Sequence, residues 1–350
     1  MIEINPSKPI LVTGGSGYIA SWIVKYLLEK GYKVRTTVRS LKDKSKITHL
    51  LDLEKQYPDN LAFFEADLMK KGSFKDSIDG CELVIHTASP FVISGIKDAQ
   101  KELIEPALEG TRNVLLSANE VSSVKRIVLT SSVVSIHGDS IDIKKVPNGI
   151  FTEKEWNTSS SLTKSPYGYS KTLAEKEAWK ICEAQNNWDL VTINPGFVFG
   201  PSLSTRKDST SIDFMLSMAN GKFKTGVAGL FFGVVDVRDV AIAHINAGFL
   251  AKAKGRHILV ANTLSMIDIA KILRDKYGNK YPFPKSVVPK FLMYFVGPFL
   301  GFNWQYVSDN IGIEIKYDNS FSKENLDINY RSLNDTITEH FDQIIKDGLL

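Results

Sequence analysis

The stretch Ile10-Leu-Val-Thr-Gly-Gly-Ser-Gly-Tyr-Ile-Ala20 decides the fold class of this protein. A short run of apolar and β-branched residues leads directly into a glycine turn, and helical spacing of apolar residues begins after it. The turn fits a dinucleotide-binding fingerprint in two frames, Gly15-x-Gly17-x-x-Ala20 and Gly14-x-x-Gly17-x-x-Ala20. In either frame the glycines let a pyrophosphate approach the backbone, and the helix start offers unpaired N–H groups. We therefore predict a nucleotide site at this turn, contacted by Gly14, Gly17, Tyr18 and Ile19.

The pattern of the first two-thirds of the chain extends this prediction. Apolar residues at Ile19, Ile23 and Leu27 predict a helix that ends at Gly31. Strand-like runs alternate with longer segments, of which 100–120 and 166–187 are long enough to be helices. The predicted strands are 10–13, 33–38, 61–65, 83–87, 126–130 and 190–194. This alternation predicts an α/β fold, a Rossmann-type doubly wound parallel sheet covered on both faces.

The rhythm of the sequence changes after about Pro195, where glycine and proline recur and the elements become short. We expect a smaller mixed C-terminal substrate lobe that shares strands with the main sheet. The predicted division is a nucleotide-binding Rossmann domain over 1–194 and a mainly substrate-binding lobe over 195–350.

Composition sets limits on the function. The 350 residues include 43 basic and 39 acidic ones, and a net charge of +4 is too small to indicate a nucleic-acid partner. Two cysteines, Cys81 and Cys182, provide no disulfide framework, and the six histidines lack metal-ligand spacing. No signal peptide or membrane span is recognisable, so the expectation is a cytoplasmic protein without a metal, monomeric or homodimeric.

The strand over 33–38 indicates which nucleotide binds. Where NAD-binding sites usually carry an acid, no Asp or Glu occurs from Gly31 to Lys42, and the strand ends in Arg39. A guanidinium suits a 2′-phosphate, which a carboxylate would repel, so NADP(H) is favoured over NAD. After the third strand, Asp67 and Leu68 are further candidates; Asp67 accepts a hydrogen bond from the adenine amino group or simply caps a turn.

Two polar groups predict proton-transfer chemistry. Tyr167 and Lys171 are four residues apart on one helical face, and a nearby ammonium brings a phenol pKa toward the working range. Tyr169 points elsewhere and is expected to pack. Ser132 follows the strand over 126–130 at the carboxyl edge of the sheet, where its hydroxyl is placed to donate to a carbonyl oxygen.

Together these motifs resemble the extended short-chain dehydrogenases/reductases. The resemblance covers roughly residues 8 to 260. Within this superfamily, the sequence is most similar to the group of dihydroflavonol 4-reductase, cinnamoyl-CoA reductase and yeast-type ketoaldehyde reductase. One departure is Ala20, where the family usually has glycine. The additional methyl group is tolerable at the contact between helix and strand. The motifs that carry the resemblance are Thr13–Ala20, Val34–Arg39, His86-Thr-Ala-Ser-Pro90, Glu109-Gly-Thr-Arg-Asn113, Thr130-Ser-Ser132, Tyr167-x-x-x-Lys171-Thr-Leu-Ala-Glu175 and Asn194–Pro201.

The resemblance implies a role for each matching position. Tyr167 would donate the proton in carbonyl reduction, Lys171 would bind the nicotinamide ribose and lower the tyrosine pKa, and Ser132 would orient the substrate. Asn113 would support a proton-relay water, or else is a polar residue inside its helix. The remaining implied contacts are with the cofactor: Arg39 and Lys46 on the 2′-phosphate, Thr87, Ala88 and Ser89 along its length, and Pro195 and Val198 near the carboxamide.

The substrate stays open at this stage. His137 stands where plant flavonoid enzymes carry an asparagine or similar residue; it is either a substrate contact or a loop residue. The aromatic stretch Phe291–Phe302 is either a helix packed on the lobe or a flap over an apolar substrate. We expect an NADPH-dependent carbonyl reductase acting on a small ketone or aldehyde. The alternatives are an NAD-dependent nucleotide-sugar epimerase or dehydratase, a sterol-type 3-hydroxy dehydrogenase, and a non-catalytic NADP-binding protein.

Overall fold

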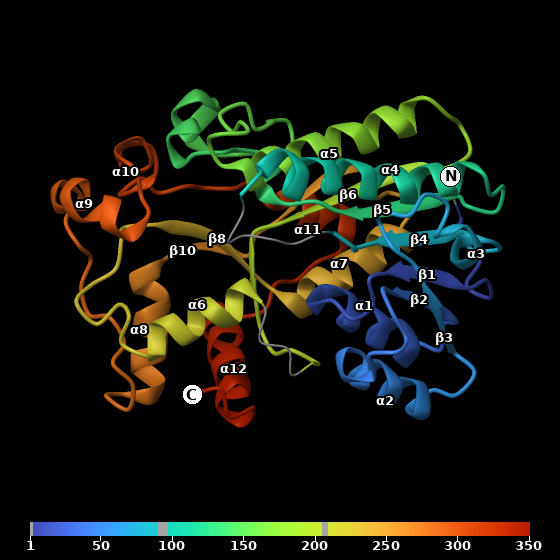
Figure 1. The fold of residues 1–350 in the computed structure, drawn as a ribbon, viewed down its shortest axis with the longest axis horizontal. Helices are drawn as coiled ribbons and strands as arrows, with labels where there is room; N and C mark the ends of the chain where they lie inside the picture. The colour runs from blue at the N-terminus through green and yellow to red at the C-terminus, as the bar shows by residue number, and fades with distance from the viewer. Residues whose placement is uncertain (1–2, 90–96, 205–208) are drawn as a thin grey trace.

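The computed structural model describes residues 3–89, 97–204 and 209–350, and in these residues a seven-stranded β-sheet forms the centre of the fold (Figure 1). All neighbouring strands in it are parallel. The α/β fold class is therefore confirmed. In sheet order the strands are β3 (Leu61–Glu65), β2 (Val34–Val38), β1 (Ile10–Thr13), β4 (Leu83–His86), β5 (Arg126–Thr130), β6 (Asp189–Pro195) and β9 (Gly255–Leu259).

The strand order creates a switch point in the sheet. The chain runs outward from β1 to β3 and then returns past β1 to β4, so the connections leave the neighbours β1 and β4 in opposite directions. Ligands of open α/β sheets bind in the crevice outside the carboxyl ends of such strands. Both strands are buried along their whole length, as expected for parallel strands covered on two faces.

Helices cover both faces of this sheet (Figure 1). On one face α1 (Tyr18–Glu29) packs against α7 (Val237–Phe249), with α2 (Thr48–Gln56) and α11 (Ser320–Leu326) nearby. On the other face α4 (Glu105–Asn119) packs against α5 (Pro166–Glu183) and α3 (Lys75–Ile78). The predicted helix over 100–120 is divided, because a wider π-helical turn, Gln100–Ile104, precedes α4.

The second lobe is built on a small sheet of β10 (Asn262–Ser265), β8 (Phe231–Asp236) and β7 (Phe197–Phe199), in that order. β10 is antiparallel to β8, and β7 is parallel to it. Around this sheet lie α6 (Thr210–Ala219), α8 (Met266–Tyr277), α9 (Lys290–Val296), α10 (Trp304–Asn310) and α12 (Leu333–Lys346). Short 3-10 turns occur at Lys44–Lys46, Val133–Ser135, Ser140–Lys145, Pro147–Gly149 and Gly297–Leu300.

The two parts of the chain are interwoven. Residues 195–350 supply β9 to the edge of the main sheet and α7 and α11 to one of its faces. The division at residue 194 stays a prediction. Among the residues described, none of the helices combines the length and the hydropathy that a membrane span requires.

Candidate active site

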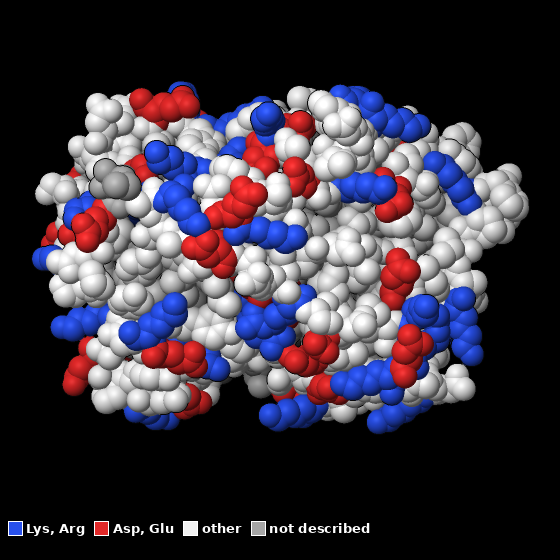
Figure 2. All heavy atoms as spheres, turned by 180° about the vertical axis from the view of Figure 1, so that it is seen from behind, with Lys and Arg blue, Asp and Glu red and all other residues white. Residues whose placement is uncertain are grey.

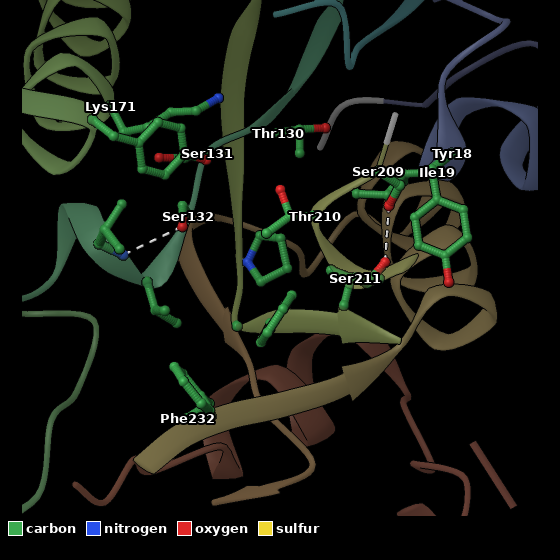
Figure 3. Close-up of a pocket in the computed structure, with 18 of the residues that line it drawn as sticks. Tyr18, Ile19, Thr130, Ser131, Ser132, Lys171, Ser209, Thr210, Ser211 and Phe232 are labelled. Carbon is green, nitrogen blue, oxygen red and sulfur yellow. Dashed lines mark hydrogen bonds between the residues drawn. The ribbon is translucent and has the colours of Figure 1, made fainter. Parts of the chain in front are cut away.

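A cavity of about 620 Å³ opens at the carboxyl edge of the main sheet and extends between the two lobes. Its wall combines the start of α1, the ends of β4, β5 and β6, and residues of the second lobe. Figure 3 shows Lys171, Ser131 and Ser132 on one side of it and Tyr18 and Ile19 on the other. The predicted site residues that line it are Tyr18, Ile19, Thr87, Ser89, Ser132, His137, Tyr167, Lys171, Pro195 and Val198.

The glycine turn after β1 is shaped for close approach of a ligand. Gly14 has φ +68°, a conformation that L side chains rarely adopt. A Cβ atom on Gly15 would lie 1.9 Å from the Thr36 hydroxyl of β2, so Gly15, absent from the predicted contacts, is also required. No side chain caps the start of α1, and its first turn carries no acid. The amides of Gly14 and Gly15 donate to the Thr37 hydroxyl and carbonyl oxygen, and the Gly17 amide donates to the Gly14 carbonyl oxygen. The groups placed to meet a pyrophosphate are therefore the first amides of α1, at the positive end of the helix.

Residues after β4 complete this side of the cavity. The Thr87 hydroxyl donates to the Thr13 carbonyl oxygen at 2.5 Å, and the Ala88 amide donates to the Thr13 hydroxyl at 3.1 Å. Ala88 also lies against Gly14, where an added Cβ would be 3.0 Å away. The two loops thus support each other at the switch point. Pro90, the last residue of the motif that begins at His86, lies outside the described residues.

Tyr167 and Lys171 both enter the cavity from the first turns of α5. The Lys171 ammonium donates to the Ser89 hydroxyl at 2.9 Å. Burial raises the pKa of Tyr167 to about 12 and lowers the pKa of Lys171 to about 8, a shift that the negative charge of Glu175 opposes. Tyr167 is therefore protonated at neutral pH, the form needed for donating a proton. The prediction that Lys171 lowers the tyrosine pKa is wrong for this structure, because burial raises the pKa of the phenol instead.

Ser132 lies at the end of β5 on the cavity wall, where its Oγ accepts from the Val134 amide at 3.3 Å. Behind it is a buried ion pair that the sequence analysis missed. The Glu175 carboxylate accepts from Arg256 Nε at 2.6 Å and from Asn194 Nδ2 at 2.8 Å, and the Ser131 hydroxyl also donates to it. Asn194 donates in turn to the Ser132 carbonyl oxygen at 3.2 Å. The network fixes the backbone of Ser132 relative to α5. In the sequence, only the four-residue spacing from Lys171 to Glu175 indicated that Glu175 lies on the same helical face as Lys171.

The structure does not bring Asn113 to Tyr167. Its side chain, on α4, donates to the carbonyl oxygens of Leu68 at 3.1 Å and Lys70 at 2.5 Å. Its Oδ1 accepts from the Gly72 amide at 2.9 Å. All three partners belong to the loop after β3, so Asn113 holds that loop, and this placement does not support a proton-relay role.

Arg39 and Asp67 come to the same edge of the sheet. Val38 of β2 pairs with Glu65 of β3, so the residues that follow both strands emerge side by side. Arg39 is exposed, while the Asp67 carboxylate accepts from the Met69 amide at 2.9 Å, the turn-capping arrangement. Leu68 packs beside Gly110 of α4. Lys46 is exposed and forms an ion pair with Asp43 at 3.0 Å. None of these four predicted cofactor residues borders the 620 Å³ cavity as described.

His137 is buried in the cavity wall rather than exposed in a loop. Its Nε2 lies 2.6 Å from the Tyr317 hydroxyl, and its ring stacks on Phe151 with the centroids 4.3 Å apart. Burial lowers the pKa of His137 to about 4, so the ring is neutral at physiological pH. Because Nε2 is engaged by Tyr317 and Nδ1 is buried, His137 is a neutral, packed part of the cavity wall, and a substrate contact through its nitrogens stays a prediction.

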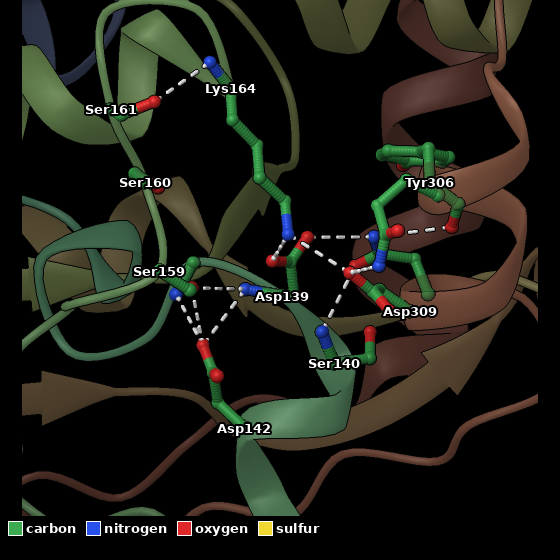
Figure 4. A network of polar contacts seen from close by, with 12 residues as sticks. Asp139, Ser140, Asp142, Ser159, Ser160, Ser161, Lys164, Tyr306 and Asp309 are labelled. Carbon is green, nitrogen blue, oxygen red and sulfur yellow. Dashed lines mark hydrogen bonds and ion pairs between the residues drawn. The ribbon is translucent and has the colours of Figure 1, made fainter.

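A polar clasp joins the second lobe to the loop that precedes Tyr167 (Figure 4). The Lys164 ammonium contacts Asp139 at 2.7 Å and Asp309 of α10 at 2.9 Å. Asn310 donates to Asp139 at 2.9 Å and accepts from the Ser140 amide at the same distance. Since Tyr306 and Asn310 line the cavity, the clasp holds α10 as one of its walls.

The stretch Phe291–Phe302 contains a helix packed on the lobe, the first of the two sequence interpretations, and the flap interpretation is wrong. None of its described residues lines the cavity, so it is no flap over this site. Met293 is buried and Tyr294 and Phe302 pack on the core of the lobe, but Phe291, Phe295 and Phe299 are exposed. Elsewhere, no cluster of three His, Cys, Asp or Glu side chains among the described residues is arranged to hold a metal ion.

Comparison with known proteins identifies the family of this chain. Residues 10–261 match the NAD dependent epimerase/dehydratase family. The chain is 42% identical over 282 residues to cinnamoyl-CoA reductase CAD2 of Medicago truncatula, covering 80% of this chain and 84% of that protein. It is 36% identical over 331 residues to an anthocyanidin reductase of Vitis vinifera, covering 89% and 94% of the two chains. The crystal structure of Gre2 from Candida albicans in complex with NADPH aligns with a TM-score of 0.79 at 30% identity, over 97% and 99% of the two chains. This chain is an oxidoreductase of the NAD dependent epimerase/dehydratase family and belongs to its extended short-chain dehydrogenases/reductases.

Proposed function

We propose that this protein is an NADPH-dependent carbonyl reductase that converts a small ketone or aldehyde to the alcohol. The observation that carries the proposal is that Tyr167, Lys171 and Ser132 share one cavity with the start of α1. The relatives named as reductases, and the Gre2 structure with NADPH, support it.

The site fits the dinucleotide. The glycine turn leaves no room for a Cβ at Gly15, and the uncapped start of α1 faces the same cavity as Ser89 and Lys171. In this proposal the turn binds the pyrophosphate, Arg39 the 2′-phosphate and Lys171 the nicotinamide ribose. When bound, NADPH supplies the hydride.

The chain's own residues supply the proton and the charge stabilisation. Ser132 donates a hydrogen bond to the carbonyl oxygen, which gains negative charge as the carbon is reduced. Tyr167 gives its phenolic proton to that oxygen, and the Lys171 ammonium stabilises the phenolate left behind. The apolar walls from Phe197, Phe232 and Ile315 favour a substrate with an apolar body.

An NADPH-consumption screen tests the proposal. The panel contains diketones, aromatic aldehydes, hydroxyketones, dihydroflavonols, acyl-CoA thioesters and steroid ketones, and we expect turnover with at least one class. Purified protein that carries stoichiometric NAD and needs no added reductant would instead indicate an epimerase. Tight NADPH binding without oxidation by any carbonyl would indicate a non-catalytic protein.

The pKa of Lys171 predicts the pH dependence of reduction. A lysine with its pKa lowered to about 8 is charged below that pH and neutral above it. We expect kcat to fall as the pH rises through about 8, because neutral Lys171 cannot stabilise the phenolate. The measurement is kcat between about pH 6 and pH 10 at constant ionic strength. In Lys171→Arg the guanidinium stays charged, so the remaining activity should lose this inflection; a wild-type profile that is flat across the range contradicts the assignment.

A further inference from the structure

The segment α9–α10 presents a cluster of exposed apolar side chains on the surface of the second lobe. Phe299 is 91% exposed, Phe295 72% and Trp304 68%. Half of the large apolar residues that are exposed in the described structure fall between residues 291 and 304. We call these the apolar patch: Phe291, Leu292, Phe295, Val296, Phe299, Leu300 and Trp304. Monomeric soluble proteins rarely expose so contiguous a group without a binding role.

The patch rests on a firm support. Met293 and Val307 on the inner sides of α9 and α10 are buried in the core of the lobe. Trp304 Nε1 donates to the Tyr294 carbonyl oxygen at 3.0 Å, and Phe302 stacks on Tyr306 with ring centroids 5.0 Å apart. The patch is therefore presented outward by a packed scaffold.

The exposed charges within the segment that carries the patch are of one sign. No Asp or Glu occurs between Lys276 and Ser308, whereas Lys280 and Lys285 are exposed ahead of α9 and Lys290 begins it. The next acid, Asp309, is buried and paired with Lys164. α9 and α10, on the left of Figure 1, lie on the right of the reversed view in Figure 2, where the outermost surface is largely uncharged.

We propose that the apolar patch docks this protein onto the surface of an anionic lipid membrane. Phenylalanine, leucine and tryptophan side chains flanked by lysines are the composition that inserts into the headgroup region of a bilayer. Lysines in a segment that carries no acid add attraction to negatively charged lipids. A second copy fits less well, because a two-fold contact would gather the lysines of both copies around one apolar interface with no carboxylate from this segment.

Docking would place the cavity close to the lipid. Tyr306 and Asn310, on the same helix as Trp304, line the cavity from inside while the patch faces out. The docking proposal does not depend on the proposed carbonyl reduction, so it is tested by binding alone.

The test is co-sedimentation of the full chain with sucrose-loaded vesicles. We expect binding to phosphatidylcholine vesicles containing about one-third phosphatidylglycerol, weaker binding at high salt, and little binding to pure phosphatidylcholine. The double variant Phe295→Ser/Phe299→Ser should lower the vesicle partition coefficient by at least about tenfold. The matched control, Leu41→Ser/Leu162→Ser, removes two exposed leucines outside the patch and should bind like the wild type.

Trp304 fluorescence reports membrane contact in the wild-type protein, so this measurement does not depend on whether the Phe295→Ser/Phe299→Ser variant folds. Of the five tryptophans, Trp304 is the exposed one; Trp22 and Trp188 are buried and Trp156 and Trp179 half-buried. Brominated lipids should quench the wild-type fluorescence, and Trp304→Phe should abolish the quenching. Wild-type protein that stays in the supernatant, or equal binding of the Phe295→Ser/Phe299→Ser variant, overturns the proposal. So does a wild-type dimer that the double variant loses, if neither protein binds vesicles.

Discussion

Replacing Tyr167 by phenylalanine is expected to lower kcat for carbonyl reduction by about 10²–10⁴-fold. The substitution removes one oxygen from a side chain that lines the cavity, so the shape of the site is kept and its proton donor is lost. In the wild type, burial keeps the Tyr167 hydroxyl protonated at neutral pH, so it is ready to donate. Phenylalanine at this position has no proton to give. The measurement is steady-state reduction of the substrate found in the screen.

The control for this experiment is Tyr169→Phe, two residues further along α5. Tyr169 is not among the residues that line the cavity, so this variant should keep near wild-type turnover. NADPH affinity, measured by fluorescence titration, should be similar in both variants and the wild type. Near-normal turnover of Tyr167→Phe would remove the proposed mechanism, even if NADPH still binds.

Replacing Arg39 by alanine is expected to raise KM for NADPH roughly 10- to 150-fold and to leave KM for NADH nearly unchanged. A hydrogen bond to a charged group contributes about 1.5–3 kcal/mol, and NADH lacks the 2′-phosphate that Arg39 would contact. Arg39 is exposed at the end of β2 with no acid in the strand, so its guanidinium is available to a ligand at the edge of the sheet. Initial rates at varied coenzyme concentration measure the effect.

Lys44→Ala is the matched control for Arg39→Ala, since it removes an exposed positive charge from the same loop. It should change KM for NADPH little. Lys46→Ala should have an intermediate effect, because Lys46 is already paired with Asp43. Equal changes in KM for NADPH and NADH in Arg39→Ala would show that Arg39 does not recognise the 2′-phosphate.

Much of the fold could be predicted because its signals are local. The strands β1, β3 and β5 have the predicted limits, and β2, β4 and β6 differ by one residue at one or both ends. The glycine turn was recognisable because a positive φ at Gly14 and a close approach at Gly15 exclude other residues. Tyr167 and Lys171 were recognisable because a spacing of four residues places two side chains on one helical face.

The errors and omissions concern long-range contacts. Asn113 has the motif expected for a proton relay, yet its amide is fully engaged by a loop some 40 residues earlier in the chain. The Glu175–Arg256 pair and the His137–Tyr317 contact join residues 81 and 180 positions apart. The aromatic stretch could be recognised as apolar, but not as exposed.

By itself the sequence determined the α/β sheet, the nucleotide turn and the Tyr167–Lys171 pair, because backbone conformation and helical or strand periodicity depend on near neighbours. The tertiary structure alone decided that His137 is a buried part of the cavity wall, that Asn113 supports a loop, and that Phe299 faces outward. Burial and hydrogen-bond partners depend on which distant segments pack together, and no local pattern of residues encodes that choice.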